Sequence, residues 1–141
     1  MIKQIAASLL VLMAVSGVTA AGTTPAPKDA YLYIGWPNDG EVLAAGQPFR
    51  VWFGLRTMGV APKGVDAPNT GHHHLLIDTE LPAFDAEIPS DRHFLHFGGG
   101  QTETMIELPP GKHTLQLLMG DYNHIPHNPP VYSKKITVYV K

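Results

Sequence analysis

The sequence has no cysteine among its 141 residues, whereas it has eight histidines. Without cysteine there can be no disulfide framework, so stability has to come from packing. Thiolate ligation of a metal is excluded as well, and so is a blue-copper site. Met58, Met105 and Met119 could offer thioethers to Cu(I), but isolated methionines in β-strands more often fill gaps in a core. Imidazole is therefore the metal ligand to look for.

Charge is also scarce. Only 16% of the residues are charged, and the formal net charge is −2. A surface that binds nucleic acid needs a basic stripe, and the sequence shows none. After the N-terminal segment, no run approaches the ~20 apolar residues of a membrane-spanning helix. We therefore expect neither nucleic acid nor a membrane span among the partners of this protein.

Residues 1–21 have the pattern of a signal peptide. Lys3 precedes an apolar run over residues 5–18, and Val18-Thr19-Ala20 is a small-residue cleavage signal. We expect cleavage near Ala20 or Ala21 and an exported, periplasmic product. An uncleaved N-terminal anchor is the alternative.

The remaining chain suits one domain of about 120 residues. Residues 22–30 are rich in Thr, Pro and Ala, and this composition predicts a short flexible lead-in. Residues 31–141 are expected to form the single folded domain. No 3.6-residue apolar stripe appears in them, so we expect no amphipathic helix.

Alternating apolar and polar residues predict strands in this domain. Between residues 49 and 55, Phe49, Val51, Phe53 and Leu55 share one face and polar or exposed residues the other. Similar runs, separated by Gly and Pro, occupy residues 31–36, 71–78, 101–108, 112–119 and 131–140. An immunoglobulin-like β-sandwich of about seven strands follows. A small barrel is the alternative, because alternation alone cannot separate the two architectures.

Three consecutive histidines begin one of these strands, in the stretch Gly-His-His-His-Leu-Leu-Ile-Asp over residues 71–78. In a strand, His72 and His74 lie on one face, and both could bind one ion through ring nitrogens at ~2.0 Å. The same alternation places Asp78 on that face. His73 points to the other face with Leu75 and Ile77, where we expect a hydrogen-bonded core residue.

A second histidine cluster lies in the loop over residues 120–130. Three prolines stiffen this loop, so His124 and His127 would be held in a defined geometry. Asp121 could orient an imidazole or cap the turn. The alternative is that the prolines only turn the corner of the sandwich and the histidines are incidental.

The third cluster contains His93 and His96, and it precedes the glycine run 98–100. This run is not a phosphate-binding loop, because no Lys-Ser/Thr follows it. His96 next to the glycines is a further ligand candidate. We expect His93 to be solvated and His113 to be an ordinary residue at the end of a strand.

These motifs resemble a bacterial exported family catalogued as domain of unknown function 4399. The resemblance covers the chain from Tyr31 onward, and it lies in Asn-Thr-Gly-His-His-His over 69–74, His-Phe-Gly over 96–98, Leu-Pro-Pro-Gly-Lys-His over 108–113 and Gly-Asp through His-Ile-Pro-His over 120–127. The histidines that match the family's motif positions are His72, His73, His74, His96, His124 and His127. The resemblance implies no activity.

The sequence therefore predicts a periplasmic protein that binds copper(II) or zinc for sequestration or delivery. The predicted ligands are His72, His74, His96, His124 and His127, with Asp78 or Asp121 behind them. Protonated imidazole cannot coordinate, so binding should fail as the pH falls.

Two other classes of function stay open. A structural or partner-binding module of the cell envelope would dock other envelope proteins through its sheet edges and the surface of Trp52, Arg50 and Arg56. A metal-dependent enzyme would need an open coordination position and a substrate cleft.

Overall fold

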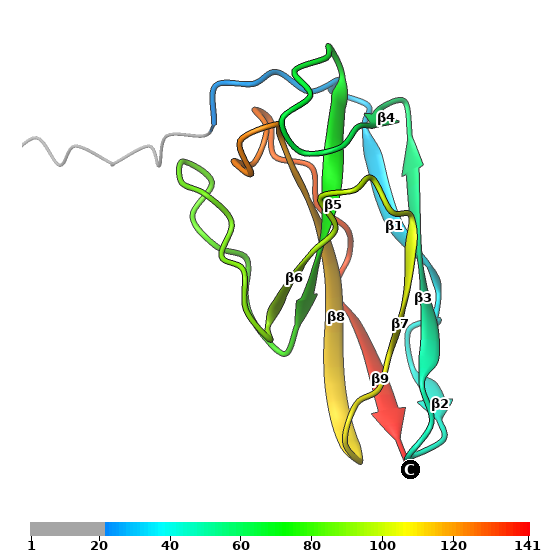
Figure 1. Ribbon diagram of the computed structural model, residues 1–141. Helices are drawn as coiled ribbons and strands as arrows, with labels where there is room; N and C mark the ends of the chain where they lie inside the picture. The colour runs from blue at the N-terminus through cyan, green and yellow to red at the C-terminus, as the bar shows by residue number, and fades with distance from the viewer. Residues whose placement is uncertain (1–21) are drawn as a thin grey trace, which may run out of the picture.

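The computed structural model describes residues 22–141, so the predicted signal peptide lies outside the described residues. The described part of the chain contains two packed sheets (Figure 1). Its strands are β1 (Tyr31–Trp36), β2 (Glu41–Leu43), β3 (Phe49–Arg56), β4 (Gly59–Val60), β5 (Thr70–Ile77), β6 (Phe94–His96), β7 (Glu103–Ile106), β8 (Gly111–Gly120) and β9 (Ile136–Val140). No helix that could cross a membrane occurs between residues 22 and 141.

The predicted all-β, immunoglobulin-like sandwich is confirmed. The smaller sheet has the order β1-β3-β7, and the larger has the order β2-β9-β8-β5-β4 with β6 added to β5. Three short strands, β2, β4 and β6, bring the strand number above the seven expected. Each of them has only two or three residues, too few to show an alternation in the sequence.

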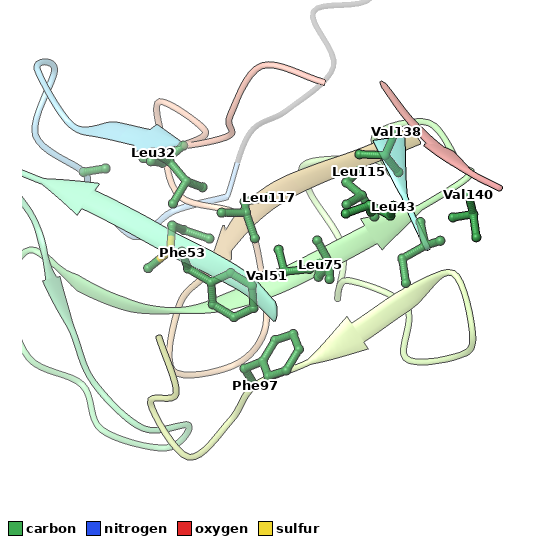
Figure 2. Close-up of a cluster of buried hydrophobic side chains, with 14 residues drawn as sticks. Leu32, Leu43, Val51, Phe53, Leu75, Phe97, Leu115, Leu117, Val138 and Val140 are labelled. Atoms are coloured by element: carbon green, nitrogen blue, oxygen red, sulfur yellow. The ribbon is translucent and has the colours of Figure 1, made fainter. Parts of the chain in front are cut away.

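The core lies between the sheets and contains the side chains that the alternation predicts. Val51 and Phe53 from β3 meet Leu75 from β5 and Leu117 from β8, all of them at most 3% exposed (Figure 2). Burial of each such side chain contributes about 1.5–3 kcal/mol. The two long strands β5 and β8 pair along most of their length, so they form the centre of the larger sheet.

Strand β5 is buried on both faces. Its inner face packs in the sandwich core. On its outer face Leu76 is covered by the loop that runs from β5 to β6, and the residues nearer its start are covered by β6 and the loop after β8. Under this cover, Leu76 and Leu118 form a second small cluster with Ile88. The outer face of β5 is therefore an interior environment, and it is the face that carries His72 and His74.

Residues 24–26 differ from the predicted flexible lead-in. The Asn128 amide donates to the Thr24 carbonyl (2.9 Å), and the Ala26 amide donates to the Asn128 carbonyl (3.2 Å). The Thr24 hydroxyl donates to the Asp121 carboxylate (2.6 Å). This segment therefore holds the loop after β8. The contact is with residues about a hundred positions away, so the local composition could not indicate it.

Asp78 does not lie behind the His72 and His74 pair, so that prediction is corrected. The chain leaves the strand conformation after Ile77, and Asp78 has a φ of 54°. Its carboxylate accepts hydrogen bonds from the Thr114 amide (2.8 Å) and from His113 Nδ1 (2.7 Å). Asp78 thus joins the end of β5 to the start of β8, at the opposite end of β5 from His72.

This contact gives a prediction for stability. Burial opposes protonation of His113, but the hydrogen bonds to Asp78 and to the Pro109 carbonyl prevail and raise its pKa. A raised pKa adds stability below the unfolded pKa of about 6.5, and that stability is lost as the pH rises through the folded pKa. Asparagine tolerates the left-handed backbone conformation as aspartate does, so Asp78→Asn removes the charge without straining the backbone. This variant should lower the free energy of unfolding by about 1–2 kcal/mol at pH 6 and by less at pH 9.

Urea unfolding of both proteins at the two pH values measures this difference. An equal loss at pH 6 and pH 9 would show that the charge on His113 plays no part in the contact.

Candidate metal centre

Four histidines from three segments meet at one end of the larger sheet. Strand β5 supplies His72 and His74, and the β5–β6 register places His96 directly opposite His74. His72 lies opposite Gly120, the last residue of β8. The loop after β8 supplies His124, so the start of β5 and this loop lie together at the upper end of Figure 1.

The four imidazole rings form one cluster. Their centroids are separated by 4.7 Å (His96–His124), 4.9 Å (His72–His74), 5.0 Å (His72–His96), 5.1 Å (His72–His124 and His74–His96) and 6.3 Å (His74–His124). One ligand nitrogen each from His72, His74 and His96 lies within 4.8 Å of the other two. These three therefore form the tight part of the cluster, and His124 is the outer member.

The spacing fits two nitrogens on one ion. Nε2 of His72 and Nε2 of His96 are 3.1 Å apart. With metal–nitrogen bonds of about 2.0–2.1 Å, two ligand nitrogens lie about 2.9 Å apart at a right angle and about 3.3 Å apart at the tetrahedral angle. Without a metal, the same contact is an N–H···N hydrogen bond in which one ring donates to the other.

The ring separations favour a tetrahedral arrangement over a square one. A tetrahedron makes all six separations equal, whereas a square makes two of them longer than the other four. Five separations fall between 4.7 and 5.1 Å, and only the one between His74 and His124 is longer. A small movement of His124 would equalise the set.

Two ring nitrogens in the cluster have no hydrogen-bond partner among the described residues. They are Nδ1 of His72 and Nδ1 of His74, on side chains that are 0% and 1% exposed. A buried polar atom without a partner typically costs about 1–3 kcal/mol. Such a cost on two adjacent imidazoles is typical of a site selected for binding more than for stability.

His72, His74 and His96 are held in the neutral form that can bind a metal. Burial first, and then the neighbouring His96 and His124, lower the pKa of His72 to about 4, against an opposing effect of the Asp121 carboxylate. Burial and the neighbouring imidazoles lower the pKa of His74 to about 3. The pKa of His96 is lowered by burial, by His124 and by Lys63. Each of these three rings is thus uncharged at neutral pH, with one of its two nitrogens unprotonated.

Asp121 determines the position of His124. Its Oδ1 accepts hydrogen bonds from the amides of Asn123 (2.8 Å) and Ile125 (2.9 Å), and its other oxygen accepts one from Thr24. His124 lies in the turn between Asn123 and Ile125 and has a φ of 65°, a conformation that costs a non-glycine residue about 1–2 kcal/mol. Asp121 therefore acts on the site through the backbone of the turn and through its charge.

Two glycines allow the rings to lie close to the backbone, and sequence reasoning did not identify either as part of the site. A Cβ at Gly120 would lie 2.7 Å from Cε1 of His74 and 3.3 Å from Cα of His124. A Cβ at Gly98 would collide with the ring of His96. The available signal was the position of each glycine within a histidine motif, two residues after His96 and four residues before His124.

His127, a predicted ligand, does not join the ring cluster. Its side chain is fully buried beside Gly71, and its Nε2 is 2.9 Å from the Thr70 carbonyl, to which it donates. That nitrogen is engaged in fastening the loop after β8 to the start of β5. The role that the geometry gives to His127 is therefore structural.

The other three histidines also lie outside the cluster. His73 is in the core as expected, 5.1 Å from the Phe53 ring, but neither of its ring nitrogens has the predicted hydrogen bond. Burial lowers its pKa to about 4, with a partial opposing effect from the Gln101 backbone. His93 Nδ1 bonds to the Ile77 carbonyl, and His113 bonds to Asp78.

A family model described as "Domain of unknown function (DUF4399)" matches residues 51–141. The chain belongs to this family. All four clustered histidines of this DUF4399 protein fall within the matched residues. A comparison with curated proteins found no match.

Among solved structures, the DUF4399 chain is similar to the fibronectin(III)-like modules of CbhA from Clostridium thermocellum. The identity is 9%, the TM-score is 0.36, and the likeness covers 77% of this chain and 92% of that one.

The lowered pKa values predict acid sensitivity of the metal-free protein. Because the folded pKa values of His72 and His74 lie below the unfolded value of about 6.5, stability is present above pH 6.5 and lost as the pH falls. In His72→Gln one such group is removed. The wild type should lose about 2–3 kcal/mol more than this variant between pH 7 and pH 4.

Urea unfolding at several pH values, with metal removed, measures the two slopes. His93→Gln is the control, because His93 lies outside the cluster, and it should follow the wild type. Parallel curves for the wild type and His72→Gln would contradict the lowered pKa of His72.

Proposed function

We propose that this protein is an exported metal-binding protein of the periplasm, which sequesters or delivers a divalent transition-metal ion. Copper(II) or zinc would be bound by His72, His74, His96 and His124. The observation that supports this most is the convergence of four imidazoles, two of them with Nε2 atoms 3.1 Å apart.

The ligand set supports copper(II) or zinc over magnesium and calcium. Neutral imidazole suits both transition metals, whereas magnesium and calcium prefer oxygen ligands. None of the three methionines between residues 22 and 141 lies in the cluster. Met119 is fully buried in the sandwich core on the opposite face of the larger sheet, Met58 packs against the same core, and Met105 is exposed on the smaller sheet.

The depth of the cluster supports reversible binding. His72 and His74 are buried on the central strand, whereas His96 and His124 are partly exposed. One side of an ion would therefore face the interior and the other side would be reachable from solvent. Sequestration and delivery both require that an ion can enter and leave without unfolding of the domain.

The first prediction for this function concerns the ligands. Untagged protein should bind one equivalent of Cu(II) or Zn(II), as measured by calorimetry with a competing chelator. His72→Ala/His74→Ala should abolish this binding. His96→Ala and His124→Ala should each weaken metal binding. The loss of affinity should exceed the roughly 10–100-fold that is typical when a residue hydrogen-bonded to a metal ligand is removed.

Two variants serve as controls. His93→Ala removes a histidine outside the cluster and should leave affinity and stoichiometry unchanged. His127→Ala should keep the stoichiometry of one, although the domain becomes less stable. Equal metal uptake by the wild type and the double variant would reject the proposed function.

The second prediction concerns the fit of the rings against the backbone. Gly120→Ala introduces a methyl group against His74 and the backbone of His124, so the cluster has to shift. Metal affinity should fall by at least about tenfold, that is, by 1.4 kcal/mol or more. Gly59→Ala is the matched control, because its Cβ would make only ordinary contacts at 3.4 Å or more. If both variants bind metal as tightly as the wild type, the metal is not bound by the four rings in the arrangement described above.

A further inference from the structure

The outer face of the smaller sheet carries an unusual set of exposed side chains. Alternation along β3 sends Val51 and Phe53 into the core and the residues between and beside them outward. The "aromatic face" consists of Tyr31, Tyr33, Arg50, Trp52, Arg56 and Met105 on β1, β3 and β7. This sheet forms the right-hand layer in Figure 1.

The large apolar side chains of this face are exposed to a high degree. Tyr31 is 50%, Trp52 47% and Met105 60% exposed. Single exposed apolar residues are ordinary, but several on one continuous sheet face indicate a surface that binds something. The metal centre does not use these residues, because it lies on the outer face of the other sheet.

Two of the aromatic rings lie flat on the sheet. Tyr33 lies directly over Gly54, its register partner on β3, so closely that a Cβ at that glycine would collide with the ring. Trp52 lies over Gly35, where a Cβ would be 2.8 Å from its Cε3. Each of these rings covers a glycine with one face. Trp52 remains about half exposed, and Tyr33 is partly exposed and stacks with Tyr31 at 5.5 Å between ring centroids. A flat platform results, instead of a row of projecting side chains.

Two guanidinium groups border this platform. The Arg56 guanidinium lies 5.3 Å from the Tyr33 centroid and 5.7 Å from the Tyr31 centroid. The Arg50 guanidinium lies 5.7 Å from the Trp52 centroid and also pairs with Glu103. Each guanidinium lies over a ring within the range of a cation–π contact, so the charge and the ring form one surface. The face thus has two positive charges and one negative, on a chain with a net charge of −2.

We propose that the aromatic face binds an acidic polysaccharide, a chain of pyranose rings that carry carboxylates. The half-exposed rings of Tyr31 and Trp52 can stack on the apolar faces of sugar rings, as aromatic side chains stack on other flat ligands. Arginines beside the rings can accept carboxylates through two parallel hydrogen bonds. Planar stacking and anion recognition are thus combined on one surface.

Other occupants fit this face less well. Insertion into a membrane interface requires aromatic side chains that project, whereas Tyr33 and Trp52 lie flat. A second copy of the chain would bring the arginines of two identical faces together without enough acidic groups to pair them. Single-stranded nucleic acid would need a longer basic track than two arginines provide.

Calorimetric titration of the purified protein with a hexamer of galacturonic acid and with a hexamer of β-1,4-linked glucose tests the proposal. The acidic hexamer should bind at least about tenfold more tightly than the neutral one, because only it pairs with the arginines. Its binding should weaken as salt is raised. Trp52→Ala should abolish binding of both sugars, and Arg50→Gln/Arg56→Gln should remove the preference for the acidic one.

Tyr132→Ala is the matched control. Tyr132 is also an exposed tyrosine (46%), but it stacks on Phe84 away from this face, so the variant should bind as the wild type does. Should Trp52→Ala fail to fold, the exposed arginine pair still tests the proposal. Binding of neither hexamer, equal binding of both by the wild type, or binding only to anionic phospholipid vesicles or an oligonucleotide would overturn it.

Discussion

The burial of β5 on both faces is the constraint on which the metal centre depends. A strand alternates its side chains between two faces, and in most sandwiches the outer face is solvated. In this protein the loop from β5 to β6 packs on Leu76, and His96 and His124 lie against His72 and His74, so the two histidines are removed from water on a central strand of the sheet. Burial then lowers their pKa values to about 4 and about 3, and the same register that pairs β5 with β6 brings His96 beside them.

The same burial has a cost. His72, His73 and His74 are fully buried, and each has at least one ring nitrogen without a hydrogen-bond partner among the described residues. Leucine in these positions would bury more apolar surface and leave no polar atom unsatisfied. An ion bound at Nε2 of His72 would not reach its Nδ1, so metal binding does not offset the cost at that atom. His73 faces the aromatic core, 5.1 Å from the Phe53 ring. The structure offers no physical account of its imidazole.

Alternation is sufficient to predict an all-β domain, the inward residues of β3, β5 and β8, and the shared face of His72 and His74, although it leaves a barrel open beside the sandwich. It failed where the chain leaves a strand. Asp78 was placed on the face of His72 because the two-residue period was continued past Ile77, where the backbone turns to positive φ. His124 and His127 were equivalent by sequence, since both lie in a proline-stiffened loop. Only the turn around Asp121 and the hydrogen bond to Thr70 distinguish them, and both depend on contacts between distant segments.

The two proposed sites lie on opposite outer faces of one core. His72 and His74 point away from the sandwich on the larger sheet, and Tyr33 and Trp52 point away from it on the smaller sheet. Between the two sheets lies the packed layer of Val51, Phe53, Leu75 and Leu117 (Figure 2). Substitutions separated by such a layer, with no shared partner, usually have independent effects. Two ring contacts cross this layer. His73, from the strand of the metal centre, lies 5.1 Å from the Phe53 ring, and Phe97, next in sequence to His96, lies 4.9 Å from the same ring. Phe53 is in turn next in sequence to Trp52, so these contacts are the places where a ligand on one face could act on the other, since a well-packed core resists gradual deformation.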